Sequence, residues 1–476
     1  WNSRPAWDVD IANLNLTEGG ISFISHNLGK KMNVPKEVTR LGGIHYVGHL
    51  SGRGDRLSSK GRLETGAGNA DIQLSKNGKN IQAKIATKGI ALDRILANKT
   101  FGQVATTIEV KGNKDHLVAK GEISRFDYNK YSFRNIRLDG QYNHGIVKGL
   151  ASIDDPNIRV DIEGNYAMKG NKYAINTHID HLQPSILGVK MADKGYSLDD
   201  IDLSANNQSS DSYLDLEAPF MSLHARGQYN LSTLVSSIQN MINEKLPTLP
   251  GIKKTKAKGD NDFTLQGNIY STEVLNKILG IPLAISSPIH INGNISEQSN
   301  ELNLYLSAPL FSYNGKPFHN GNVELTTLDN ALSLEARITQ GMPYEKAPEI
   351  KLKAAAADNV LSTLLNYNNH SSKLPLSGLL NADTRFSKNE QGQLTIQTSV
   401  KPSSLMLGDT QWDVKASTVE YHKNHLTVDN FVVKHDKQHV IINGMATPNK
   451  EDSIVADLKD VDVAYILNLV NFHSVD

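Results

Sequence analysis

The chain has 476 residues, with 50 basic and 50 acidic side chains and no cysteine. A net charge of zero removes the general attraction to phosphates, so nucleic acid is excluded as a leading partner. The lack of cysteine excludes disulfide scaffolds, cysteine-ligated zinc, iron–sulfur clusters and cysteine nucleophiles.

Strict alternation of apolar and polar residues dominates the chain and is typical of strands with one buried and one solvated face. The clearest runs are residues 104–110, 158–162, 173–179, 302–306, 332–338 and 394–396. Turn dipeptides that accept positive φ angles predict tight hairpins at residues 77–78, 139–140, 292–293, 314–315, 320–321 and 443–444. The pattern predicts a predominantly antiparallel β protein built from one or two elongated sheets.

Helical spacing occurs only in short pieces that follow alternating strands. Apolar residues three and four apart predict helices over residues 90–97, 233–242, 274–279, 360–365 and 463–470. Ser232, Ser271 and Asp358 stand where an N-cap would accept a hydrogen bond. The distance between these units varies, so the pattern excludes a solenoid of fixed period.

One composition shift suggests a domain boundary. Over residues 244–262 the alternation stops, prolines appear and four lysines fall within six residues. We expect a Pro/Lys-rich linker there, between a first β-repeat segment (1–243) and a second one (263–476). A solvated linker is the favoured interpretation, and a basic arm that touches an anionic membrane surface or partner is the alternative.

The sequence lacks the spacings that bring catalytic groups together. It contains no HExxH, Walker, Rossmann or GxSxG motif. The nearest groups of possible ligands are better explained as exposed strand histidines and acidic turns: His422 with His425, His435 with His439, and Asp199 with Asp200 and Asp202. We therefore expect no catalytic residue, no metal site and no cofactor, and we rank an enzyme last.

A diffuse pattern carries a family resemblance. Residues 7–11 (WDVDI) lie near the start of the chain, residues 223–231 (LHARGQYNL) predict a strand that leads into a short helix, and Trp412 precedes residues 426–431, 441–444 and 452–458. On these segments the chain resembles the amino-terminal or middle portion of AsmA- and TamB-type bacterial envelope proteins. The resemblance covers most of the chain.

The resemblance implies a periplasmic sheet that is anchored to the inner membrane by a segment upstream of this chain. It also implies an Omp85-type outer-membrane barrel partner, bound through a region outside this chain. With the alternation, it predicts an all-β fold with a few short amphipathic helices. Its elongated antiparallel sheet would curl into a U-shaped trough with one apolar face.

An apolar sheet face must be covered by a second sheet, by helices or by a ligand. Alternation alone favours an ordinary sandwich core, whereas the resemblance implies a trough that holds phospholipid acyl chains. Strand parity, which a bulge reverses, predicts that the groove is lined by Val104, Ile108, Ile158, Val160, Ile162, Leu214, Leu216, Leu302, Leu304, Leu306, Leu332, Leu334, Ile338, Leu394 and Ile396.

The expected function is a non-enzymatic periplasmic conduit that moves phospholipid between the inner and outer membranes. The alternative is a scaffold or chaperone for the assembly or translocation of outer-membrane β-barrel proteins. Such a scaffold would offer its sheet edges for strand addition.

Overall fold

A computed structural model describes residues 6–17, 19–20, 36–208, 211–256, 259–388, 390, 392–449 and 451–462. It assigns 31 strands to one sheet, and neighbouring strands pair antiparallel. The prediction of an antiparallel all-β protein with a few short helices is confirmed.

The contacts divide the chain into two compact units. Unit 1 holds residues 1–209, 214–219 and 277–280, and unit 2 holds residues 210–213, 220–276 and 281–476. The expected linker at 244–262 therefore lies inside unit 2. Its first two residues belong to a helix, and Leu246 is buried against the sheet of that unit.

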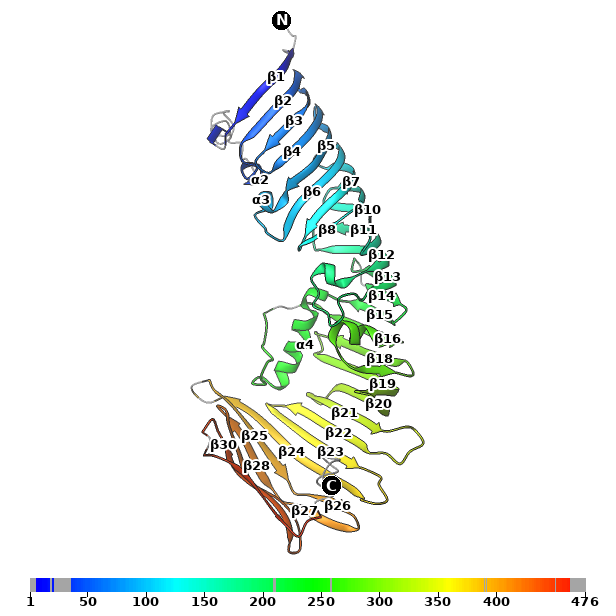
Figure 1. The fold of residues 1–476 in the computed structure, drawn as a ribbon, viewed down its shortest axis with the longest axis vertical. Coiled ribbons are helices and arrows are strands. Elements are labelled where there is room, and N and C mark those ends of the chain that lie inside the picture. The colour runs from blue at the N-terminus through cyan, green and yellow to red at the C-terminus, as the bar shows by residue number, and fades with distance from the viewer. Residues whose placement is uncertain are drawn as a thin grey trace. The chain divides into compact units, whose positions relative to one another are not determined.

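From β1 to β13 the strands of unit 1 pair in chain order, except that β8 and β9 both pair with β7. Figure 1 shows the order of these strands along the sheet. The strands of unit 1 are β1 (Ala6–Leu16), β2 (Ile44–Arg53), β3 (Arg56–Thr65), β4 (Gly68–Asn77), β5 (Asn80–Ala91), β6 (Phe101–Gly112), β7 (His116–Tyr128), β8 (Tyr131–Phe133), β9 (Ile136–Asn143), β10 (Ile146–Asp155), β11 (Ile158–Ala167), β12 (Lys172–Leu182), β13 (Leu198–Asn206) and most of β14 (Tyr213–Ala218). The helices are α2 (Lys36–Thr39), α3 (Leu92–Leu96) and the 3₁₀ turn η1 (Pro184–Leu187).

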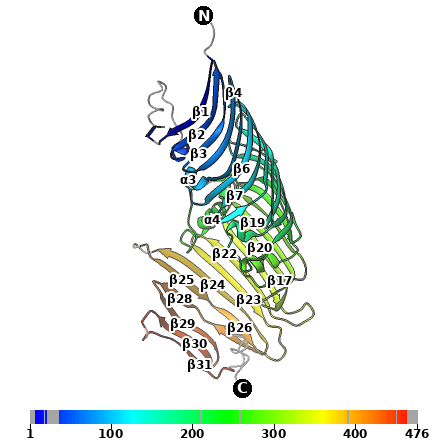
Figure 2. The same ribbon diagram turned by 45° about the horizontal axis from the view of Figure 1, so that its top comes forward.

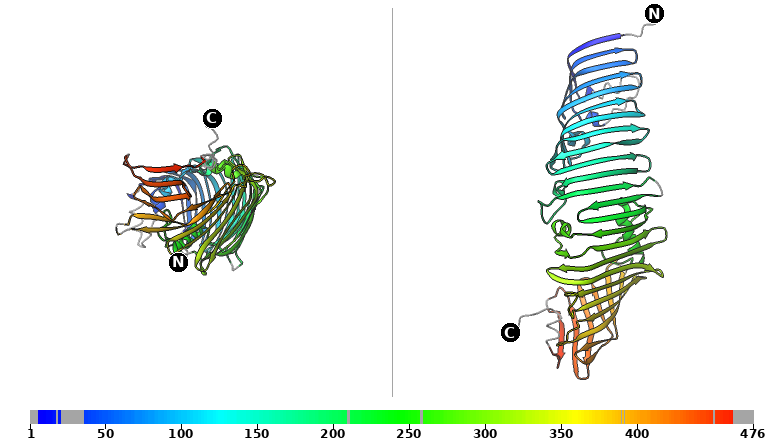
Figure 3. Two further views of the ribbon diagram at one scale, coloured as in Figure 1. Left: turned by 90° about the horizontal axis from the view of Figure 1, so that it is seen from below. Right: turned by 90° about the vertical axis from the view of Figure 1, so that its right-hand side faces the viewer.

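Unit 2 holds the remaining strands and the long helix α4 (Leu231–Lys245), as Figures 2 and 3 show. The strands are β15 (Met221–Gln228), β16 (Asp262–Ile269), β17 (Leu283–Ile285), β18 (Ile289–Ser296), β19 (Glu301–Tyr313), β20 (Lys316–Leu328), β21 (Ala331–Gln340), β22 (Glu349–Ala357), β23 (Val360–Asn368), β24 (Leu376–Lys388), β25 (Leu394–Lys401), β26 (Ser403–Leu407), β27 (Thr410–Val414), β28 (Ser417–His422), β29 (His425–His435), β30 (Gln438–Ala446) and β31 (Ile454–Lys459). The π-helix η2 (Leu275–Leu279) is shared between the units.

The register of the strands sorts the side chains onto two faces, because directly paired residues lie on the same face. In unit 1 one column of paired residues is largely apolar and consists of Ile72, Ile85, Ile108, Gly121, Leu138, Ala151, Ile162, Thr177 and Leu203. A neighbouring column on the opposite face is charged and contains Lys84, Glu109, Lys120 and Asp139. The alternation seen in the sequence thus produces an apolar face and a polar face.

Two of the six predicted hairpin turns are confirmed, those at residues 77–78 and 314–315. The other four dipeptides lie within β9, β18, β20 and β30. In two of these, glycine permits the close approach of a neighbouring strand, since a Cβ on Gly293 would lie 2.5 Å from the Asn303 carbonyl oxygen and one on Gly444 would lie 2.3 Å from that of Ser453.

Three of the five predicted helices are confirmed, as α3, α4 and η2, and the one at residues 463–470 lies outside the described residues. The helix predicted at residues 360–365 is wrong, because these residues begin β23. Asp358 and Asn359 form a hairpin turn with φ angles of 50° and 62°, so Asp358 is no N-cap. Ser271 caps as predicted, whereas the N-cap of α4 is Asn230 and not Ser232.

Paired glycines on β9 and β10 allow a matched test of strand packing. Replacing Gly149 with alanine should lower the free energy of unfolding by about 1–3 kcal/mol, because the added Cβ would lie 2.4 Å from the Asp139 carbonyl oxygen. Replacing its partner Gly140 should change stability by less than about 0.5 kcal/mol, since the nearest atom to its Cβ is 3.7 Å away. Denaturant unfolding measures both, and equal effects would contradict the register.

Candidate apolar binding face

The predicted lining residues of β6 and β11 lie on one face of unit 1. Ile108 and Ile162 belong to the apolar column described above. Val104 pairs with Phe126, which packs against the same core as Ile158 and Val160. The bulges in β5, β7 and β12 do not interrupt the predicted runs of β6 and β11. All five predicted residues of these two strands therefore lie on the same face of the sheet, as strand parity predicts.

Part of this face is covered by the short turn η1. Its Ile186 is buried against Phe133, Ile136, Ile158 and Val160. Ile158 and Val160 therefore belong to a closed core and do not face an open groove.

Another part of the same face is open. Ile162, two residues beyond Val160, is 37% exposed, and Ile85 and Leu138 of its column are exposed to a similar degree. Trp7 and Val9 on the edge strand β1 are also exposed. The sequence prediction missed Ile85 and Leu138, although the alternation of Ile81, Ala83 and Ile85 could have indicated the first of them.

In unit 2 the eight predicted residues of β19, β21 and β25 also share one face. One column runs through Gly293, Leu304, Leu325, Leu334, Ala354, Thr363, Ala382 and Val400. Alternation places on that face Leu302, Leu306, Leu332, Ile338, Leu394 and Ile396. Leu302 is buried, and the other seven are half-buried.

Two segments close parts of the face in unit 2. Leu246, which follows α4, is buried with Ala356 and Phe386, and Leu332 and Ile396 pack against this cluster. Among the last strands, β24 pairs with both β25 and β26, and β27 pairs with β29. Their side chains form a closed core of Val400, Trp412, Val414 and Val433. The sandwich-core alternative thus describes this end of the sheet, whereas Ile350 and Leu365 stay more than a third exposed on the same face.

The predicted lining residues of β14 are only partly accessible. Leu214 and Leu216 are both half-buried. Their neighbours Asp215 and Glu217 line a hollow of unit 1.

Each unit has a hollow that runs across its strands. That of unit 1 has a volume of about 700 Å³ and takes three successive residues from each of β9 to β13, with the apolar column from Leu138 to Leu203 in the middle. The hollow of unit 2 has a volume of about 680 Å³. It is lined by a row of paired residues and by the residue before and after each of them; the row is Gly267, Ile291, Leu306, Val323, Ala336 and Leu352. Both hollows therefore follow a column from strand to strand, and their linings also include side chains of the opposite, polar face, such as Asp139 and His178 in unit 1 and Lys353 in unit 2.

Cross-strand ion pairs mark the polar face. Lys84 lies 2.9 Å from Glu109, and Lys120 lies 2.7 Å from Asp139. Lys353 lies 2.7 Å from Glu335 in unit 2. Because basic and acidic side chains are paired on this face, it is rich in charge although the chain has a net charge of zero.

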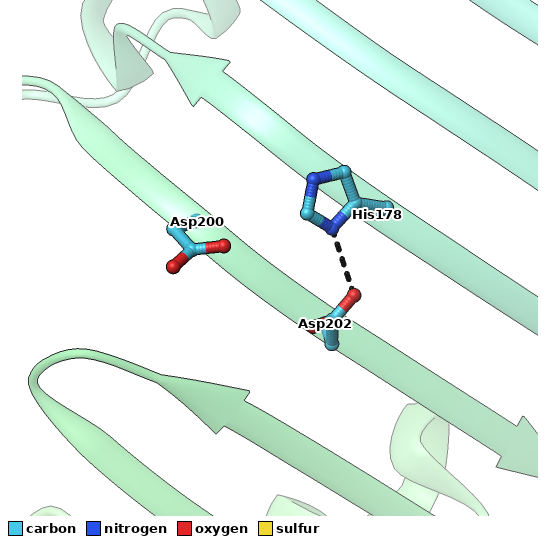
Figure 4. A group of neighbouring side chains, drawn as sticks. All are labelled: His178, Asp200 and Asp202. Carbon is cyan, nitrogen blue, oxygen red and sulfur yellow. Dashed lines mark hydrogen bonds and ion pairs between the residues drawn. The ribbon is translucent and has the colours of Figure 1, made fainter.

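A histidine and two aspartates lie together on this face (Figure 4). His178 Nδ1 donates to Asp202 Oδ1 at 2.8 Å, and Asp200 lies beside them, with possible ligand atoms of all three within 4.8 Å of one another. The hydrogen bond to Asp202 raises the pKa of His178, and the charges of Asp202, Asp200 and Asp180 add to the shift. Asp199, Asp200 and Asp202 lie in β13, so the predicted acidic turn is wrong.

Comparisons with known proteins give no family. No family model, no curated protein and no solved structure matches the chain. Among the described residues, no helix is both long and apolar enough to cross a membrane.

The His178 pair predicts a pH dependence. A pKa raised by folding contributes stability that is fully present below the unfolded-state value of 6.5 and is lost as the pH rises through the folded-state value. Replacing His178 with glutamine should therefore destabilise unit 1 more at about pH 5.5 than at about pH 8. The effect should be small, because the pair is exposed.

Denaturant unfolding at the two pH values measures this difference, and the NMR titration of the His178 ring measures its pKa directly. Asp202→Asn should remove the same pH dependence while keeping the histidine. An unchanged His178 titration in Asp202→Asn would contradict the assignment.

Proposed function

We propose that this protein is a non-enzymatic conduit that carries phospholipids between the inner and outer membranes of the bacterial envelope. The observation that supports the proposal is an apolar sheet face that remains partly open in each unit. Ile85, Leu138 and Ile162 in unit 1 and Ile350 and Leu365 in unit 2 are all more than a third exposed. The resemblance to AsmA- and TamB-type proteins supports a periplasmic location with an inner-membrane anchor upstream.

The chemistry of the face favours acyl chains over other apolar ligands. Its side chains are mainly aliphatic, and aromatic residues make up 6% of the chain. Transferring each CH₂ group of a lipid from water to such a surface is worth about 0.8 kcal/mol. Two acyl chains would therefore bind firmly while the head group stays in water.

The direction of the apolar columns suits transport along the sheet. In unit 1 the column from Ile72 to Leu203 passes through directly paired residues of successive strands, so it runs across the strands and not along any single one. An acyl chain that moves along this column meets an apolar side chain on most of the strands.

A second candidate function, assembly of outer-membrane barrel proteins, is favoured by the free strand edges. In the described sheet β1 pairs with β2, and β31 pairs with β30. All six residues of β31 are exposed. An extended segment of an Omp85-type barrel, or of its substrate, could add to such an edge. This hypothesis predicts a complex with a barrel protein and no bound lipid.

Organic extraction of the purified protein tests the first proposal. We expect mass spectrometry of the extract to detect diacyl phospholipid. The triple variant Ile85→Asn, Leu138→Asn and Ile162→Asn should lower the lipid bound per protein roughly tenfold or more, because each change removes apolar surface worth about 1.5–3 kcal/mol when it is buried by a ligand. Its melting temperature should change little, since the three side chains are already partly exposed.

The opposite face provides a matched control. Val47 and Val118 are apolar residues exposed to a similar degree, their strand partners Arg62 and Gln141 are polar, and neither lines the hollow of unit 1. Asparagine at these two positions should leave the bound lipid unchanged. A lipid-free extract from the wild type, or equal losses in the triple variant and in this double variant, would refute the conduit.

A further inference from the structure

Helix α4 has an apolar stripe that the protein leaves open. The stripe repeats at intervals of three and four residues, which places its members on one side of the helix: Leu231, Val235, Ile238, Ile242 and Leu246. Leu231 is 57% and Val235 is 67% exposed, whereas Leu246 at the other end is 5% exposed. Ile238 and Ile242 are half-buried. Burial therefore increases along the stripe towards its C-terminal end.

The opposite side of α4 is polar and is fixed to the strand ends of unit 2. The fully buried Asn261 donates to Ser237 Oγ and to Glu297 Oε1, both at 3.0 Å. Asn240 Oδ1 accepts from the backbone N–H of Thr255 at 2.8 Å. These hydrogen bonds, of which that from Asn261 to Ser237 is fully buried, prevent the helix from turning its apolar stripe towards the strand ends.

The end of α4 is held on the apolar face of the sheet. Leu246 is buried against Ala356 and Phe386, which lie on that face. Lys245 Nζ donates to Asn330 Oδ1 at 2.7 Å, and the N–H of Thr248 donates to Asn359 Oδ1 at 3.0 Å. The stripe and the sheet thus meet at Leu246, and the stripe becomes more exposed towards Leu231.

We propose that the apolar stripe of α4 is the second wall of an acyl-chain slot in unit 2, with the apolar face of the sheet as the first. The inference rests on the proposed conduit function and names the part of unit 2 that holds the lipid. Acyl chains are the expected occupant because the stripe joins the apolar face of the sheet at Leu246, and the ammonium group of the buried Lys245 beside it is hydrogen-bonded to Asn330 and Glu244. Both walls consist of aliphatic side chains, so an acyl chain between them would contact apolar surface on two sides.

Local charge argues against an anionic membrane surface as the occupant. Lys254 and Lys256 lie near α4, but they share a cavity of about 1020 Å³ with the four carboxylates of Glu244, Asp260, Asp262 and Glu297. The lysines are therefore outnumbered by acids beside the helix. Attraction to anionic lipid needs an excess of basic side chains.

Photo-crosslinking from the helix tests the slot in the full chain. Benzoylphenylalanine replaces Val235, and the protein is irradiated with detergent-dispersed dioleoylphosphatidylcholine. We expect a mass increase of one lipid molecule, with the bond formed on an acyl chain. Ser236 is the control position, since it lies one residue further and about 100° around the helix. It should give at least fivefold less crosslink.

The outcomes separate this inference from the conduit itself. If lipid is extracted from the wild type but Val235 and Ser236 crosslink equally, the slot is refuted and the conduit stands. A crosslink from Val235 that forms only with dioleoylphosphatidylcholine vesicles, or only to a protein, also refutes the slot. If the wild type holds no lipid, the conduit fails and the slot fails with it.

A paired substitution gives a second readout. Leu231→Asn with Val235→Asn should lower the lipid bound per protein at least threefold without changing the melting temperature, because both side chains are largely exposed. Unchanged lipid content in this variant would overturn the slot even if crosslinking proved inefficient.

Discussion

Alternation along the strands gives each unit an apolar face, and the rest of the structure depends on how that face is covered. A sheet that pairs with no second layer leaves one side in contact with water unless helices, its own curling strands or a ligand cover it. Three segments of this chain cover parts of it: η1 through Ile186, the end of α4 through Leu246, and the last strands around Val414. Between these segments the aliphatic side chains stay partly exposed, and this exposure is the observation behind the proposed lipid conduit.

The polar face supports the apolar one by fixing the register. Lys84, Glu109, Lys120 and Asp139 stand in one column with alternating charge. Exposed pairs of this kind add little to stability one by one. A slip of one residue, however, would bring these charges onto the apolar face and put like charges or unpaired charges there. The ion pairs therefore specify which side of each strand is apolar, which is the property that a conduit requires.

The sequence predicts which residues of a strand share a face, because strand parity is a local property. Each predicted run, such as residues 158–162, contains no bulge, and the bulges of the sheet fall in partner strands or between runs. The turns were harder to predict. Asp329-Asn330, Asp358-Asn359 and Lys423-Asn424 form two-residue turns with positive φ angles and no glycine. Without glycine as a signal, residues 360–365 resembled a helix that follows a capping aspartate.

The sequence could not predict which segments cover the apolar face, because each of these segments is held by contacts between residues that are far apart in the sequence. Nothing in the spacing around Leu246 indicates that it packs against Ala356 and Phe386, more than a hundred residues later. The same separation in the sequence explains why residues 244–262 resemble a linker. Lysines and prolines dominate their composition, while the residues that fix the segment are single ones such as Leu246 and Thr248.

These fixed contacts determine what α4 can do. Opening the helix away from the sheet would expose Leu246 and break the hydrogen bonds of Lys245 with Asn330 and of Thr248 with Asn359. Unmet hydrogen bonds to buried groups cost about 1–3 kcal/mol each, and more for a charged group such as Lys245. The other end is held through the buried side chain of Asn261. Since both ends are anchored, α4 is held in place on unit 2, and in the proposed conduit a lipid would have to pass along the helix without displacing it.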